Sequence, residues 1–203
     1  MTRRGWSLVE MMVALGLMSI VMAIVAMTFI RTNRFSMGQN QRAAIQGSIQ
    51  QISKELESVL QRTCNDGISW QPAGVQPALL GIHCLQDGSS VPNLRYENVY
   101  HCYLWDKANQ RLTSTICPPG PGSPSAPPTD RPQKLAPAQI TALVNAGPGT
   151  KLLAEGVSNF DVTFVSGPLV RFTVEIKRAI PGQAGFDKRQ ITKDLTLRNR
   201  YRP

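Results

Sequence analysis

The chain has 203 residues, of which 42% are hydrophobic, and this length and composition allow one folded core with appended segments. The formal net charge is +9, and the sequence lacks the GxSxG, HExxH and Walker-loop motifs that mark common classes of enzyme. We therefore expect a structural or binding protein, not an enzyme, and we expect no metal and no cofactor.

The first predicted element is a long apolar helix. Residues 11–30 carry no charged side chain, and a helix over residues 6–30 would be about 37 Å long, enough to cross the hydrocarbon core of a membrane. A removable secretory signal fits less well, because its apolar run is shorter and an acid, Glu10, lies inside this one. Residues 6–30 are therefore predicted to span a membrane.

Glu10 is the one acid in this apolar segment. An ionised carboxylate at membrane depth costs at least a few kcal/mol, so it needs a partner. No basic residue lies between Gly5 and Arg31. Cleavage after Gly5 would free an α-amino group on Trp6, four residues before Glu10, and this group could pair with Glu10 on one helix or between packed helices. The alternative is a plain signal anchor whose Glu10 reaches the membrane interface.

The sequence "RRG" followed by "WSLVEMMVALGL" resembles the class III signal of type IV pilin-like proteins. The resemblance implies that residues 1–5 are a leader, which a prepilin peptidase removes by cutting after Gly5. It also implies that Trp6 becomes the methylated amino terminus and that Glu10 helps the subunit dock into a filament. Trp6 departs from the phenylalanine that is usual at this position.

The helical pattern continues over residues 31–62 as an amphipathic half of the same helix. Its apolar residues recur at steps of four and three and form one seam, which comprises Ile45, Ile49, Ile52, Leu56 and Val59 or Leu60. Gly38 and Gly47 are expected to weaken the helix locally by up to about 1 kcal/mol each, which makes a bend or local melting plausible. We predict one helix from residue 6 to residue 62.

Residues 63–117 contain all four cysteines of the chain, Cys64, Cys84, Cys102 and Cys117. Behind a membrane segment, four cysteines indicate two disulfides in an oxidising compartment, which places residues 31 onward outside the cytoplasm. We favour Cys64 with Cys84 and Cys102 with Cys117, and the other pairings stay open. Zinc is the rival interpretation, because His83 and His101 each precede a cysteine, but the gaps do not form the usual zinc knuckles.

Two further segments follow in chain order. Residues 99–105 and 111–117 form a predicted hairpin around a turn at residues 107–110. Residues 118–137 hold eight of the 15 prolines and are predicted to form an exposed loop that acts as a spacer.

Residues 138–203 show the strongest strand pattern. Apolar and polar residues alternate over residues 160–164, 170–176 and 191–197. An antiparallel meander of these strands would bury its apolar face on the helix seam, which gives an α+β fold. This layout also resembles the pilin fold.

The sequences "LLAEGVSNFDVTFV" and "ITKDLTLRNR" resemble the later part of PilW-like minor pilins, and J-type minor pseudopilins of type II secretion have a similar plan. The resemblance implies a single-pass inner-membrane protein with a periplasmic C-terminal domain that enters a pilus at the cell surface. Its partners would be other minor pilins, the major pilin, the prepilin peptidase and the inner-membrane assembly platform. It would prime or tip the filament, and a type II secretion pseudopilin is the alternative.

A second alternative is a pilin that binds DNA during DNA uptake. Residues 168–203 contain nine basic and three acidic residues, and a basic surface there would comprise Arg171, Lys177, Arg198 and Arg200. The acidic residues interrupt this surface, and no aromatic array accompanies it for base stacking, so nucleic acid is the less favoured partner.

Overall fold

A computed structural model describes residues 7–71, 78–86, 95–117, 130–146, 149–180 and 185–197. Gly5, Trp6, Arg198, Arg200 and most of the proline-rich loop lie outside these ranges, so their expected roles stay predictions. The chain divides into two compact units, one with residues 1–43 and 179–185 and one with residues 44–178 and 186–203.

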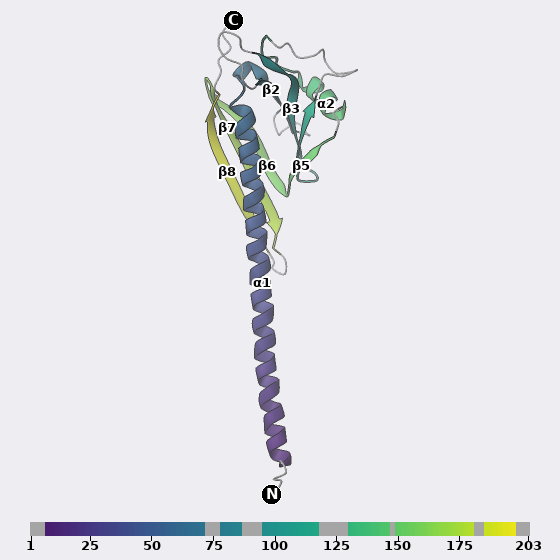
Figure 1. Ribbon diagram of the computed structural model, residues 1–203, viewed down its shortest axis with the longest axis vertical. Helices are drawn as coiled ribbons and strands as arrows, with labels where there is room; N and C mark the ends of the chain where they lie inside the picture. The colour runs from purple at the N-terminus through teal and green to yellow at the C-terminus, as the bar shows by residue number, and fades with distance from the viewer. Residues whose placement is uncertain are drawn as a thin grey trace. The chain divides into compact units, whose positions relative to one another are not determined.

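Helix α1, Leu8–Leu60, is the longest element (Figure 1). It ends two residues before its predicted end and continues through Gly38 and Gly47, so the local melting considered there does not occur in this structure. A Cβ added to either glycine would meet no packed neighbour within 4 Å, so close packing does not require glycine at these two positions.

The second unit is built around the apolar seam of α1. The seam residues are buried as predicted, and Ile45, Ile52, Leu56 and Leu60 are each fully buried. They join apolar residues from two separate sheets in one core cluster. The expected α+β fold, a long amino-terminal helix packed on antiparallel sheet, is therefore confirmed, although the strands form two sheets and not one.

The first sheet has five strands in the order of the chain, and each neighbouring pair is antiparallel. A short 3-10 helix, η1 (Asn65–Gly67), leads into it. The strands are β1 (Ile68–Gln71), β2 (Ala78–Leu85), β3 (Tyr96–Asp106), β4 (Arg111–Cys117) and β5 (Lys151–Glu155). The predicted hairpin corresponds to β3 and β4, with β3 starting three residues earlier than expected.

Strand β2 is buried along its whole length. Alternate residues such as Leu80 and Ile82 face the cluster around α1, whereas Leu79 joins a second cluster on the opposite face. Helix α2, Pro137–Ala146, covers that second face with Ile140 and Leu143. This double burial explains why β2 shows no alternation of apolar and polar residues in its sequence.

Helix α2 was not predicted, because strands were expected from residue 138. Pro137 occupies its first turn, where a missing N–H costs nothing. The Ala136 N–H donates to Gln139 Oε1 at 2.8 Å, which satisfies one backbone group at the helix start. A proline followed by Gln139 and by apolar residues three apart was the sequence signal for this helix.

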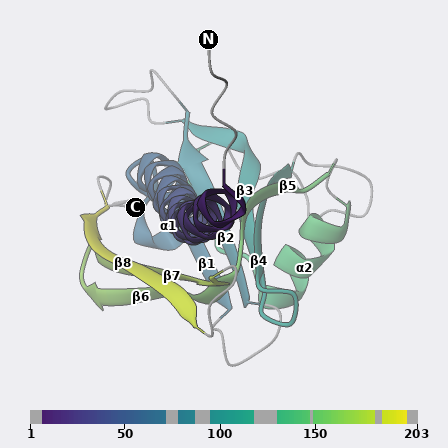
Figure 2. The ribbon, with the colours of Figure 1, turned by 90° about the horizontal axis from the view of Figure 1, so that it is seen from below.

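The second sheet has the order β6-β7-β8, with β6 (Val157–Ser166), β7 (Leu169–Ala179) and β8 (Phe186–Thr196). Figure 2 looks along α1 and shows this sheet and the five-stranded sheet on different sides of the helix, with α2 beyond the latter. The predicted apolar residues of β7 are all buried. Phe164 of β6 is 45% exposed, so the prediction that it faces the core is wrong.

Candidate functional site

Ser7 and Glu10 start helix α1 with two reciprocal hydrogen bonds. The backbone N–H of Glu10 donates to Ser7 Oγ at 3.2 Å, and the backbone N–H of Ser7 donates to Glu10 Oε2 at 2.9 Å. This is the capping-box arrangement, which satisfies two N–H groups that otherwise lack a partner at a helix start. Glu10 therefore has a structural role in its own helix, and the sequence analysis missed it, although the S-x-x-E spacing was its signal.

The cap uses only residues 7–10, and all of them would remain after cleavage behind Gly5. The carboxylate is held toward the amino-terminal end of the helix through Oε2. A carboxylate has a second oxygen, Oε1, and each oxygen accepts more than one hydrogen bond. Capping and pairing with an amino terminus are therefore compatible uses of the same side chain.

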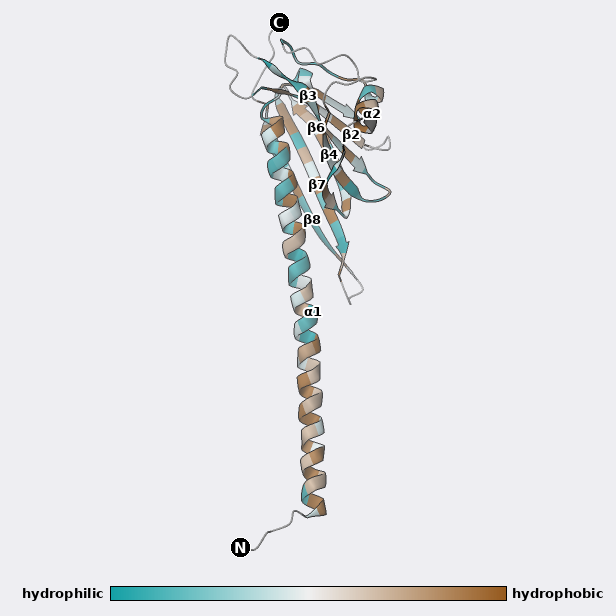
Figure 3. Cartoon of the chain, turned by 45° about the vertical axis from the view of Figure 1, so that its right-hand side comes forward, coloured by the Kyte–Doolittle hydropathy of each residue, from teal (hydrophilic) through white to brown (hydrophobic). Residues whose placement is uncertain are grey.

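The first part of α1 exposes large apolar side chains along its length, and Figure 3 colours most of this part of the helix as hydrophobic. Its hydroxyl groups bond to their own helix: Ser19 Oγ donates to the Gly16 carbonyl at 2.8 Å, and Thr28 Oγ1 donates to the Ile24 carbonyl at 2.8 Å. A helix in lipid must satisfy its polar groups internally in this way. By length and composition α1 can cross a membrane.

All four cysteines are buried, and the structure joins none of them to another by a disulfide. In the β3–β4 ladder Cys102 stands opposite Thr115 and Cys117 opposite Tyr100, so the two cysteines are diagonal neighbours on one face. Their sulfur atoms hydrogen-bond to each other, and this bond together with burial raises the pKa of the Cys102 thiol.

Cys64 and Cys84 have different neighbours. Cys64 Sγ lies 3.8 Å from Tyr96 Oη, and Cys84 Sγ donates to the Val59 carbonyl at 3.5 Å. Neither of these contacts tests the expected Cys64–Cys84 bond, so that pairing stays a prediction.

The basic surface expected near the end of the chain is partly neutralised in the described residues. Arg171 forms two hydrogen bonds with Asp194, at 2.6 and 2.8 Å, and these bonds lower the pKa of the Asp194 carboxyl. Lys177 lies over the ring of Phe186 with its Nζ 4.2 Å from the centroid. The Asp194 carboxylate thus offsets the charge of Arg171, whereas Lys177 keeps its charge.

A comparison with known families matches the segment that contains this helix start. The model of the prokaryotic N-terminal methylation motif matches residues 1–26. The chain carries a prepilin-type signal. No significant match was found among curated proteins or among solved structures.

The matched range includes Gly5, Trp6 and Glu10, and their roles in cleavage, methylation and docking stay predictions. The signal supports a type IV pilin-like or pseudopilin-like protein that is processed by a prepilin peptidase and assembles with components of a pilin system. Together with the apolar first part of α1, it indicates membrane anchoring of a chain whose later residues form a folded domain.

Proposed function

We propose that this chain is a minor type IV pilin of the PilW-like kind, which primes or tips a pilus together with other minor pilins. The observation that carries the proposal is the continuity of α1, because one helix contains residues 8–26 of the prepilin-type signal, with their exposed apolar side chains, and also the seam that is buried in the folded unit. Such a helix supplies a filament stem, and the two sheets supply a surface that selects neighbouring subunits.

In this proposal the apolar part of α1 holds the subunit in the inner membrane, with the second unit in the periplasm. Prepilin peptidase cuts after Gly5 and methylates Trp6. Glu10 then pairs with the amino terminus of a neighbouring subunit, because an unpaired carboxylate is costly in an apolar surrounding. The inner-membrane assembly platform adds the subunit to a filament that also contains the major pilin.

A disulfide between Cys102 and Cys117 belongs to the same proposal. The hydrogen bond between the two sulfur atoms supports this pairing, and an oxidising periplasm would supply the disulfide donor that accepts two electrons and two protons from the thiols.

A deletion of the gene, complemented with the wild-type chain, tests the assignment to a pilus. We expect loss of surface pili and of twitching motility, with both restored by complementation. Intact pili together with loss of secreted proteins would contradict the proposal and favour a minor pseudopilin of a type II secretion system.

A further inference from the structure

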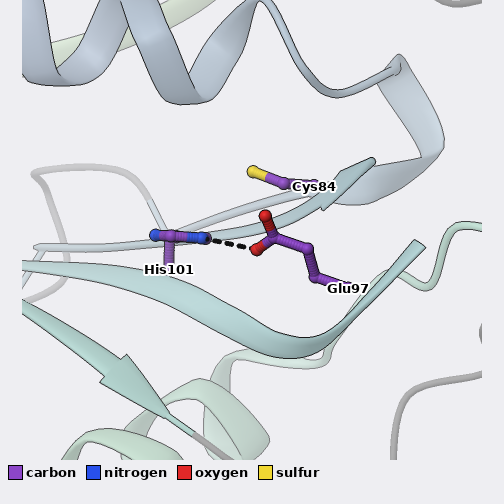
Figure 4. A group of neighbouring side chains, drawn as sticks. All are labelled: Cys84, Glu97 and His101. Carbon is purple, nitrogen blue, oxygen red and sulfur yellow. Dashed lines mark hydrogen bonds and ion pairs between the residues drawn. The ribbon is translucent and has the colours of Figure 1, made fainter. Parts of the chain in front are cut away.

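Three side chains with metal-binding atoms converge on the face of β2 and β3 that packs toward α1. They are Cys84 of β2 and Glu97 and His101 of β3, and Figure 4 shows them pointing toward one another. A thiol sulfur, a carboxylate oxygen and an imidazole nitrogen from these residues all lie within 4.8 Å of one another. All three residues belong to the second unit.

The sheet brings these residues together although 12 residues lie between Cys84 and Glu97 in the sequence. The β2–β3 pairing shifts register between His83 and Leu85, so the irregularity falls at Cys84. Such irregularities redirect side chains in a strand pair. His83 lies on the opposite face, where its Nδ1 accepts the Gln133 N–H at 3.2 Å and its Nε2 lies 2.8 Å from the backbone carbonyl oxygen of Glu97, so both of its ring nitrogens are engaged outside the cluster.

The cluster is largely shielded from solvent. Cys84 is fully buried, and the side chains of Glu97 and His101 are 19% and 15% exposed. Glu97 Oε2 lies 2.8 Å from His101 Nε2, whereas Glu97 Oε1 accepts a hydrogen bond from Arg62 Nη1 at 2.7 Å. The two carboxylate oxygens are thus divided between the imidazole and the guanidinium.

We propose that Cys84 Sγ, Glu97 Oε2 and His101 Nε2 form a binding site for a divalent transition-metal ion of the Zn²⁺ type. Thiolate and imidazole ligands suit Zn²⁺, whereas Ca²⁺ and Mg²⁺ prefer sites made of oxygen atoms alone. Arg62 would stay on Oε1 and orient the carboxylate from outside the ligand set, a role that such partners commonly have in metal sites.

The distances are close to those that a tetrahedral ion requires. Bonds of about 2.0 to 2.3 Å place the ligand atoms of Zn²⁺ about 3.3 to 3.8 Å apart. The present separation of 2.8 Å between Glu97 Oε2 and His101 Nε2 must therefore widen slightly. The sulfur, which lies within 4.8 Å of both, must come to about 3.5 Å from them, an approach of at most about 1.3 Å.

One of the three proposed ligands, His101, borders a cavity from which a fourth ligand would come. His101, Arg62 and Val59 line a cavity of about 510 Å³, which is large enough for water molecules or for a side chain of another protein. Zinc sites that bind an external ligand have this coordination, in which the protein supplies three ligands and the fourth position is open.

The proposal requires Cys84 to be a thiolate. It therefore excludes the predicted Cys64–Cys84 disulfide in the same molecule, and it leaves Cys102 and Cys117 free to pair with each other. The two chemical states of Cys84 are distinguishable by peptide mass spectrometry.

The test uses the full chain, purified in detergent micelles with a phosphine reductant, stripped with a chelator and titrated with Co²⁺ as a spectroscopic probe. We expect one Co²⁺ per chain, a thiolate-to-Co²⁺ charge-transfer band in the near ultraviolet, and displacement of Co²⁺ by one equivalent of Zn²⁺. Cys84→Ala should abolish the band. His101→Ala should weaken binding at least about 100-fold, because even residues outside the ligand set contribute 10- to 100-fold.

Two variants keep this test independent of folding. Cys102→Ala removes a buried thiol on the other face of the sheet and should leave the stoichiometry and the band unchanged. Glu97→Gln keeps the shape of the side chain and should weaken Co²⁺ binding while the band persists, and near-ultraviolet circular dichroism verifies that each variant is folded.

Three results would overturn the proposal. They are the absence of Co²⁺ binding to the reduced wild-type chain, a charge-transfer band that survives Cys84→Ala, and a Cys64–Cys84 disulfide in protein isolated from cells under conditions that block thiol exchange.

Discussion

Glu10 combines two demands at one position. Its Oε2 caps the start of α1 through the Ser7 N–H, and its charge is proposed to meet the amino terminus of a neighbouring subunit. A glutamate at the third helical position serves both purposes, because a cap needs only an acceptor whereas docking needs a negative charge. The two roles can therefore be separated by substitution.

Glu10→Gln retains a side-chain acceptor at the capping position but loses the charge, whereas Glu10→Ala loses both. We expect both variants to stay in the membrane fraction and both to be strongly reduced in sheared filaments or filament-tip complexes, as measured by immunoblotting. Ser7→Ala is the matched control, since it removes one capping bond and keeps the charge, and it should be incorporated. Normal incorporation of Glu10→Gln would show that the charge has no docking role.

Glu57 links α1 to strand β8 through Lys193. A hydrogen bond from Lys193 lowers the pKa of the Glu57 carboxyl below its usual value of 4.5, and burial opposes this shift while a bond from Ser53 Oγ adds to it. In the unfolded chain the Glu57 carboxyl binds a proton more readily than in the folded chain. The stability that the Glu57–Lys193 pair contributes is therefore fully present above pH 4.5, and it is lost as the pH falls through the lower pKa of the folded state.

Glu57→Gln should therefore reduce the loss of stability that occurs on acidification below pH 4.5, and it should lower stability at pH 7. The urea midpoint of the full chain in detergent, measured from pH 7 down to pH 3, provides the comparison. Lys193→Met removes the same pair from the other side and should have the same effect. An unchanged dependence on pH in both variants would contradict this account.

At the level of elements, η1 and the end of β2 approach each other closely at Gly67. A Cβ on Gly67 would stand 2.5 Å from Thr63 Oγ1 and 2.7 Å from the His83 carbonyl oxygen. These two atoms form a buried hydrogen bond of 2.7 Å with each other. The site therefore has no room for a larger residue, and the obstacle includes backbone.

Gly67→Ala should destabilise the folded unit by about 1 to 3 kcal/mol, the usual cost of overpacking. Gly81→Ala is the control, because its Cβ would meet Ile140 at 3.5 Å, an ordinary contact. Urea unfolding followed by circular dichroism measures both. Equal effects of the two substitutions on the free energy of unfolding would contradict this explanation.

The elements that the sequence revealed are those in which one face is buried and the other is exposed. The seam of α1 and the alternation in β7 are of this kind, and both follow directly from residue periodicity. Strand β2 has two buried faces and α2 is short, so neither carries a clear period. The division of the strands into two sheets depends on packing around α1, which no local pattern encodes.

The candidate sites divide in the same way. Gly5, Trp6 and Glu10 form a contiguous motif, so the sequence alone was sufficient to single them out. The cluster of Cys84, Glu97 and His101 arises from strand pairing and an irregular register, and spacing in the sequence argued against a zinc site there. Contacts between residues on different strands are the part of a site that is hardest to predict from the sequence of a single protein.

At the scale of the whole molecule, the chain joins two units with different surroundings. The first carries the prepilin-type signal and a helix whose apolar side chains are exposed. The second has a core in which the later half of α1 meets both sheets. In the function proposed above, the first unit holds the subunit in the membrane before the subunit is transferred to a filament.

The mature amino terminus tests this central claim most directly. Mass spectrometry of the protein isolated from cells should find a first residue Trp6 that carries an N-methyl group, and a Gly5→Leu variant should keep the leader. A wild-type chain that retains Met1–Gly5 in cells with an active prepilin peptidase would contradict the account.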